Sequence, residues 1–201
     1  MRVILVGALG LSIMATISVA QTNPTVRVRG TIEKVDGNVL SIQSRDGQTV
    51  TLKLDDNFSA TRVVKASLED IKPNSFVGTA ALPLPDGTMK ALEVHIFPEA
   101  LRGTGEGSRE FDLQPKSTMT NAAVTGIVNS TDGRVLTLTY KGGEKKVVVP
   151  ANAPVVTFEP AKKEDIKPGI GIIVFGAERL PDDTLRARRI TIGGNGVNPP
   201  M

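Results

Sequence analysis

The chain of 201 residues lacks several residue types on which common active sites depend. It has no cysteine and no tryptophan, and it has a single histidine and a single tyrosine. Without cysteine there can be no disulfide, thiolate metal site or cysteine nucleophile. One histidine cannot build a usual structural zinc site. Few aromatic residues and a net charge of only +3 also argue against a nucleic-acid surface, which needs a basic stripe and stacking side chains.

The first twenty residues have the pattern of a secretory signal. Arg2 is followed by an apolar run that ends in the small residues Ser18-Val19-Ala20. We predict cleavage after Ala20 and a mature protein that is periplasmic or secreted, with an uncleaved anchor as the alternative. No later segment is apolar over the length that a membrane-spanning helix needs, so none is expected after signal cleavage.

Two stretches, 26–98 and 122–193, repeat the same sequence blocks. The offset is 96 residues for the first block and 95 for the block that contains Ile-Lys-Pro, as small loop insertions in a duplicated unit produce. The matching blocks are Val28–Ile32 with Val124–Val128, Asp36–Leu40 with Asp132–Leu136, Glu69–Pro73 with Glu164–Pro168, and Pro85–Thr88 with Pro181–Thr184.

Within each repeat the side-chain pattern predicts strand, strand, strand, short helix, strand, strand. Alternating apolar residues predict half-buried strands, and Asp-Gly pairs such as Asp36-Gly37 predict tight turns. The helix is expected at Ser67–Lys72 and ends at Pro73. Asp183 replaces the turn glycine of the first repeat, and aspartate tolerates positive φ. The fold class predicted is therefore all-β: two tandem five-stranded OB-like barrels, each with one short helix between strands three and four.

These patterns divide the chain into five parts. A loop as long as the segment between the repeats is uncommon unless it is functional or a linker, so it is either an ordered site or a tether. The parts are a signal peptide at 1–20, the first OB-like β-barrel repeat at 21–98, a Gly-rich connecting segment at 99–121, the second OB-like β-barrel repeat at 122–193, and a disordered tail at 194–201.

The Asp-Gly turns and the Ile-Lys-Pro break make each repeat resemble the domain-of-unknown-function 5666 family. The whole chain is also similar to a group of exported two-repeat bacterial proteins, most specifically in the blocks His95–Gly107 and Ser117–Asn121. The resemblance implies small exported all-β modules, here in a two-repeat bacterial protein, without a settled activity. Such proteins are often described as metal-transporter permeases. This sequence contradicts that description, because a permease needs several apolar spans.

The strand alternation places Glu93 and His95 on one outer face. With Glu99 nearby they can hold a divalent cation, because histidine and carboxylates are common ligands. The alternative is an exposed histidine that the connecting segment covers. We predict no bound metal and no cofactor.

Other charged residues suggest anion binding. Gly103, Gly105 and Gly107, flanked by Arg102 and Arg109, can cradle an anion through backbone N–H groups, or can simply turn the chain. Two basic clusters can meet an anionic envelope polymer or lipid head group, or can protect strand edges. They are Lys141, Lys145 and Lys146 on one hairpin and Arg186, Arg188 and Arg189 on the last strand.

No nucleophile–base pair is apparent, so we do not expect an enzyme. The sequence predicts an exported binding or interaction module of the cell envelope, whose partner is an envelope protein, a polymer or a small polar ligand and not a nucleic acid. The alternative is a periplasmic metal-ion or anion carrier. The candidate ligand-binding residues are Glu93, His95, Glu99, Arg102 and Arg109.

Overall fold

The computed structural model describes residues 25–199, whose regular secondary structure is almost all β-strand. The signal peptide predicted at 1–20 lies outside the described residues. Within them, no helix is long and apolar enough to cross a membrane. The strands are β1 (Thr25–Asp36), β2 (Val39–Ser44), β3 (Thr49–Lys65), β4 (Phe76–Pro83), β5 (Met89–Phe97), β6 (Gly107–Glu110), β7 (Thr118–Ser130), β8 (Gly133–Tyr140), β9 (Gly143–Pro150), β10 (Val155–Ala161), β11 (Gly171–Arg179) and β12 (Leu185–Gly193).

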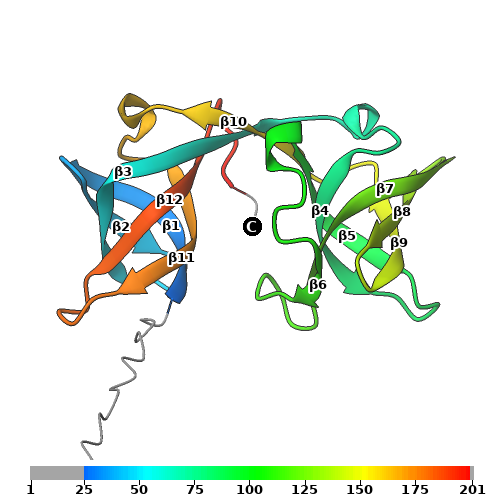
Figure 1. Ribbon diagram of the computed structural model, residues 1–201, viewed down its shortest axis with the longest axis horizontal. Helices are drawn as coiled ribbons and strands as arrows, with labels where there is room; N and C mark the ends of the chain where they lie inside the picture. The colour runs from blue at the N-terminus through cyan, green and yellow to red at the C-terminus, as the bar shows by residue number, and fades with distance from the viewer. Residues whose placement is uncertain (1–24, 200–201) are drawn as a thin grey trace, which may run out of the picture.

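Strand pairing closes two five-stranded barrels. The first barrel runs β1, β2, β3, β12, β11 and back to β1. The second runs β7, β8, β9, β5, β4 and back to β7. The two barrels lie side by side, and β3 and β10 bridge them along one edge (Figure 1). The predicted all-β class and the closed five-stranded barrel are therefore confirmed.

The arrangement of the strands differs from the predicted tandem, because each barrel takes strands from both repeats. β4 and β5, from the first repeat, complete the second barrel, and β11 and β12, from the second repeat, complete the first. Neither 21–98 nor 122–193 forms a barrel alone. The cause is β3, which continues beyond the first barrel to Lys65 and pairs with β10. Both crossing strands carry the chain to the opposite barrel.

A single 3-10 turn stands where each short helix was expected. The turns are Leu68–Asp70 and Lys163–Asp165. In the first, the Asp70 carboxylate accepts hydrogen bonds from the Ser67 backbone N–H at 2.8 Å and from the Ser67 hydroxyl at 2.9 Å. These bonds lower the pKa of Asp70. In the second, Asp165 accepts a bond from the Lys162 backbone N–H at 2.8 Å.

The first strands of the two repeats match at a different offset from the one that the sequence suggests. Ile32 pairs with Ile42 and donates its backbone N–H to the Ile170 carbonyl, directly before the fourth strand of its barrel. Val124 pairs with Leu138 and donates in the same way. The structural counterpart of Ile32 is therefore Val124, although the sequence blocks align it with Val128. The β7–β8 hairpin is correspondingly longer than the β1–β2 hairpin.

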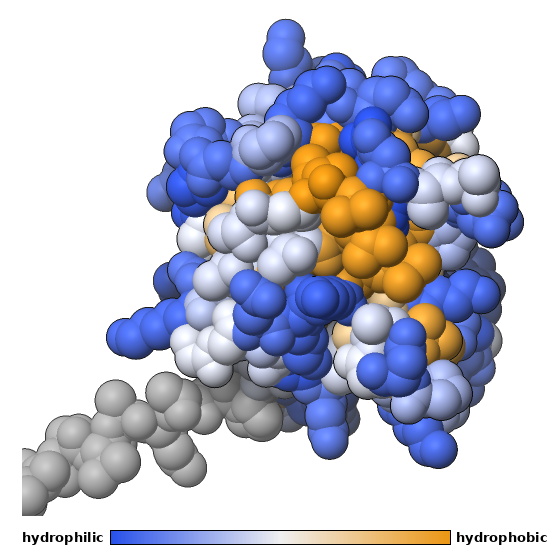
Figure 2. All heavy atoms as spheres, turned by 90° about the vertical axis from the view of Figure 1, so that its right-hand side faces the viewer, coloured by the Kyte–Doolittle hydropathy of each residue, from blue (hydrophilic) through white to orange (hydrophobic). Residues whose placement is uncertain are grey.

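Three apolar cores hold the molecule together. One fills each barrel, with fully buried residues such as Leu40 and Leu136. The third lies between the barrels and includes Phe111 from the connecting segment. Fully burying side chains of this size contributes roughly 1.5–3 kcal/mol each. Outside these cores, apolar side chains also gather on the outer side of the second barrel (Figure 2).

The connecting segment and the C-terminal tail lie between the barrels (Figure 1). The segment forms a 3-10 turn at Glu99–Leu101 and the strand β6, which pairs with β7. The tail, expected to be disordered, closes a turn through a bridge between Gly194 and Val197, and Val197 packs on the third core. The predicted turn at Asp183 is confirmed, with φ at 63°.

Candidate functional site

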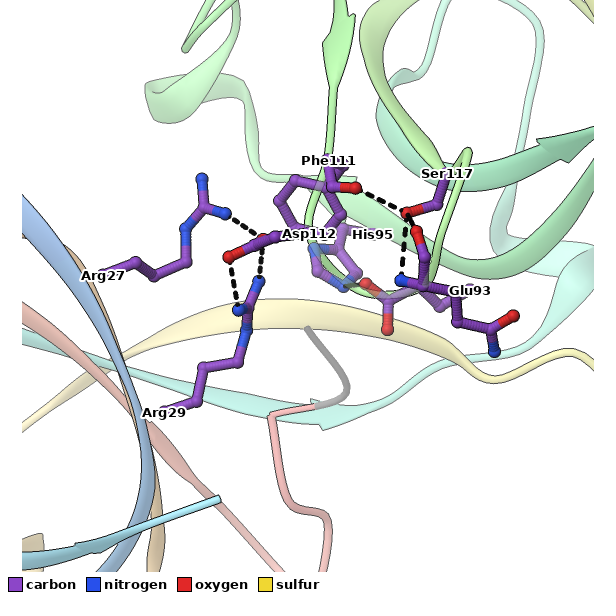
Figure 3. Close-up of polar contacts among 8 residues, drawn as sticks. Arg27, Arg29, Glu93, His95, Phe111, Asp112 and Ser117 are labelled. Carbon is purple, nitrogen blue, oxygen red and sulfur yellow. Dashed lines mark hydrogen bonds and ion pairs between the residues drawn. The ribbon is translucent and has the colours of Figure 1, made fainter. Parts of the chain in front are cut away.

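Glu93 and His95 share one face of β5, as predicted, but that face is not exposed. Their side chains are 2% and 1% accessible. The face lies outside the second barrel yet inside the molecule. Phe158 of β10 packs edge-on against the His95 ring, with 5.5 Å between the centroids. Phe111 also lies at this junction (Figure 3). The expectation of an outer, exposed histidine is therefore wrong, because the barrel interface covers it.

The buried pair is polar but incompletely satisfied. His95 Nε2 lies 3.3 Å from Glu93 Oε1, close enough for attraction but without hydrogen-bond alignment. On β7, which β4 separates from β5, Thr118 and Asn121 each hold a buried side-chain oxygen without a hydrogen-bond partner among the described residues. Among residues 25–199, no group of three or more histidine, cysteine or acidic side chains is placed to hold a metal ion. The pair supplies two ligand groups and no third.

Glu99 and Arg102 neutralise each other at the start of the connecting segment. Arg102 Nε donates to Glu99 Oε1 at 2.7 Å, which lowers the pKa of Glu99 and raises that of Arg102. Arg102 also donates to the Asn74 carbonyl at 2.9 Å and lies over the Phe76 ring. These contacts fasten the segment to the second barrel. The Arg102 donors that could bind an anion are therefore already bonded to Glu99 and to the Asn74 carbonyl.

The three glycines of the segment all have positive φ, at 82°, 57° and 122° for Gly103, Gly105 and Gly107. They therefore turn the chain. Arg109 follows them on β6 and donates to the Gly105 carbonyl at 2.9 Å. Burial of one side of Arg109 and repulsion from Arg27 lower its pKa. Of the predicted residues, Arg109 is the one that faces further cations across the junction.

The contact that joins the connecting segment to the first barrel was not predicted. Asp112 accepts two hydrogen bonds from Arg29, at 2.7 and 2.9 Å, and pairs with Arg27 (Figure 3). The two guanidinium groups hold the pKa of Asp112 far below its usual range. Both also lie over the Phe111 ring, at 4.7 and 5.3 Å from its centroid. The segment is therefore an ordered clamp between the barrels.

Sequence reasoning missed this contact because Arg29 and Asp112 are 83 residues apart. The available signal was the alternation on the first strand. Arg27 and Arg29 point away from the core side of that strand, so both were free to meet another element.

An exposed apolar row crosses the outer face of the second barrel. Val128 pairs with Val135, and Val135 pairs with Val148, so the three side chains point the same way. Val128 is 65% exposed. Lys90 lies beside Val148 at the end of the row. This row lies on the side of the molecule where Figure 2 shows apolar side chains at the surface.

The same row in the first barrel is charged. By the same pairing it consists of Asp36, Val39, Lys53 and Arg186. Asp36 therefore stands where the second barrel has Val128, and Lys53 where it has Val148. The sequence did contain part of this signal. The substitution at Asp36 was hidden because the first strands were aligned at the wrong offset.

The two basic clusters predicted from the sequence divide in the structure. In the last strand, Arg186 and Arg188 form ion pairs with Glu178 and Asp55. Arg189 forms no ion pair with a described residue. In the hairpin, Lys146 is exposed and lies on the same face of β9 as Val148. Because acids neutralise two of its three arginines, the cluster on the last strand does not form a continuous basic surface among the described residues.

Comparison with protein-family models, with characterised proteins and with solved structures gives no match. The functional inferences therefore rest on the geometry of this chain.

Proposed function

We propose that the protein is an exported, non-enzymatic interaction module of the cell envelope. It docks a protein partner on the outer face of β8 and β9 of the second barrel. The observation that carries this proposal is the row Val128, Val135 and Val148, which is apolar throughout. The equivalent row of the first barrel has a valine only at the middle position, between Asp36 and Lys53.

The barrel fold does not require this row. Outward positions of a barrel strand contribute little to its core, and the first barrel closes with charged residues there. A contiguous apolar row on the surface costs solubility and commonly marks an interaction site. Its retention in one barrel only therefore favours a binding role.

The chemistry around the row supports a protein partner with an acidic rim. Lys90 and Lys146 border it, and neither forms an ion pair with a described residue. A complementary surface has an apolar centre and an acidic rim. A membrane is a poorer match, because interfacial membrane contacts use aromatic residues, and the chain has no tryptophan and one tyrosine.

Strand order supports the location by analogy. Counting each barrel's strands as one to five, the order is one, two, three, five, four and back to one, as in OB-like barrels. Such barrels bind ligands on the face of strands two and three, which in the second barrel are β8 and β9. We therefore propose two OB-like barrels with exchanged strands, consistent with the family resemblance noted above. The absence of any expected nucleophile–base pair supports a non-enzymatic role.

The test is site-specific photo-crosslinking in the native host. A photoreactive side chain is placed at position 135, and a matched control carries it at position 39, the equivalent place in the first barrel. We expect a discrete adduct with one envelope protein from position 135 and none from position 39. Adducts with lipid, adducts with a second copy, or equal adducts from both positions would reject the proposal. Val148→Lys in the same chain should abolish the adduct.

A further inference from the structure

The junction between the barrels holds more positive than negative charge. Arg27 and Arg29 reach it from β1 and Arg109 from β6. Among the described residues, Asp112 is the only carboxylate within ion-pair distance of these three arginines. Among residues 25–199, Arg109 has only the Gly105 carbonyl as its side-chain acceptor, and Arg27 repels it.

A fourth arginine lies beside the cluster on the first barrel. Ile173 pairs with Thr191, and Glu178 with Arg186. The pairing is interrupted between these two pairs, and the interrupted stretch holds Phe175 of β11 and Arg189 of β12, which are both exposed. Phe175 is 46% exposed, and the Arg27 guanidinium lies 5.5 Å from its centroid. Arg27 is therefore held between Phe111 and an exposed aromatic side chain.

The arginine cluster costs stability, and the barrel fold does not require it. The Nε atoms of Arg27 and Arg29 are buried and have no hydrogen-bond partner in the described part of the chain, and an unsatisfied buried donor costs roughly 1–3 kcal/mol. The counterparts of Arg27 and Arg29 in the second barrel are Met119 and Asn121, by the offset that pairs Ile32 with Val124. A barrel of this kind therefore forms without arginine at these positions.

Asp112 shows what the cluster accepts. Its carboxylate takes two parallel hydrogen bonds from Arg29 and an ion pair from Arg27. Such forked contacts are the usual mode of carboxylate and phosphate recognition by arginine. Asp112 is one carboxylate, and within the described residues Arg109, Arg189 and the exposed part of Arg27 have no further counter-charge.

We propose that Arg27, Arg109 and Arg189 form a binding site for an external oxyanion group, a phosphate or a carboxylate, beside the Asp112 clamp. Phe175 provides an apolar edge for the rest of the ligand. The site lies on a different surface from the valine row and does not depend on it, so either can fail while the other holds.

The test uses the mature full-length chain and two probes, inorganic phosphate and citrate, each titrated at constant ionic strength against chloride. Calorimetry measures affinity, and NMR follows the arginine Nε–Hε signals. We expect saturable binding of at least one probe, with shifts at Arg27 and Arg109. Phosphate alone identifies a phosphoryl ligand, and citrate alone a carboxylate ligand. Binding of neither probe would overturn the proposal.

Variants locate the site. Arg109→Gln should weaken binding roughly tenfold, and Arg189→Gln by a smaller factor, because each removes a charge-assisted hydrogen-bond donor. Arg179→Gln is the matched control, since Arg179 stands at the end of β11 on the first barrel and pairs with Asp183. We expect no change there. An equal loss in Arg179→Gln and Arg109→Gln would show general screening and reject the site. Unchanged thermal melting of each variant confirms that it is folded.

Discussion

The two barrels have matching interiors and different exteriors. In the first, one inward row runs across four strands through Val35, Leu40, Leu52 and Leu185. In the second, the equivalent inward row is also apolar throughout, and consists of Ile127, Leu136, Val147 and Met89. The adjacent residue on each strand points outward, and these outward rows differ in charge between the two barrels.

That difference separates what the fold requires from what it permits. Inward positions must be apolar in both barrels, because they fill a closed interior. Outward positions are free to change, and in the second barrel they have become valine at two places where the first has aspartate and lysine. Functional surfaces are therefore best sought where the two barrels differ, at the valine row and at the arginine cluster.

The largest expected effect tests whether the barrels are independent. Ile42→Ala in the first barrel and Leu138→Ala in the second each remove a fully buried side chain, at a cost of about 2–5 kcal/mol. The barrels exchange strands and share a third core, so both variants should shift one common unfolding transition. Urea unfolding followed by circular dichroism measures this. Two separate transitions, each sensitive to one variant, would show that the barrels fold independently.

A second prediction tests whether Gly30 and Gly126 occupy equivalent positions in the two repeats. A Cβ on Gly30 would lie 2.1 Å from the Gln43 carbonyl oxygen, whereas a Cβ on Gly126 would meet Thr137 at 3.0 Å. Gly30→Ala therefore forces the backbone apart and should cost about 1–3 kcal/mol. Gly126→Ala should cost clearly less, because a side chain can give way.

Thermal unfolding of the two glycine variants decides between the alignments. The sequence blocks make these glycines equivalent, and the strand pairing does not. Equal losses of stability would favour the alignment that the sequence suggests.

Local sequence signals predicted the class of fold and most strands, but not the exchange of strands between the barrels. Side-chain alternation and Asp-Gly turns were enough to predict an all-β protein and most strands, because these signals are local. The strand exchange was not predictable, since β4 makes similar contacts whether it joins β1 or β7. The decisive feature is the continuation of β3 through Asp55–Ser59, where the apolar period is lost.

The candidate site was predicted in part. Arg109 was selected, and Glu93 and His95 do share a face, but their burial depends on packing between barrels that the sequence pattern does not encode. The Asp112 clamp joins residues far apart in the chain, and no local pattern connects them.

A smaller effect concerns the clamp. The pKa of Asp112 is depressed in the folded state, so its contribution is present above the ordinary value of 3.8 and is lost as the pH falls toward the folded value. Asp112 is 55% exposed, which screens the pair, and we expect about 1 kcal/mol. Asp112→Asn should therefore lose stability at pH 7, and its difference from the unmodified chain should shrink below about pH 4.

Urea unfolding at pH 7, 4 and 2.5 measures this difference. Asp36→Asn is the matched control, because Asp36 is an exposed aspartate of the first barrel whose nearest cation is 3.9 Å away. A deficit in Asp112→Asn that stays constant with pH would mean that the carboxylate charge is not what stabilises the junction.

The smallest effect on stability is expected from exchanging the outward residues of the two barrels. Val148→Lys gives the second barrel the residue of the first, and Lys53→Val does the reverse. Both side chains point away from the cores, so each change should alter the free energy of unfolding by no more than about 0.5 kcal/mol. Thermal melting checks this. Partner crosslinking from position 135 should nevertheless disappear in Val148→Lys and persist in Lys53→Val. If Val148→Lys instead destabilises the chain by several kcal/mol, the valine row belongs to the fold and not to a binding surface.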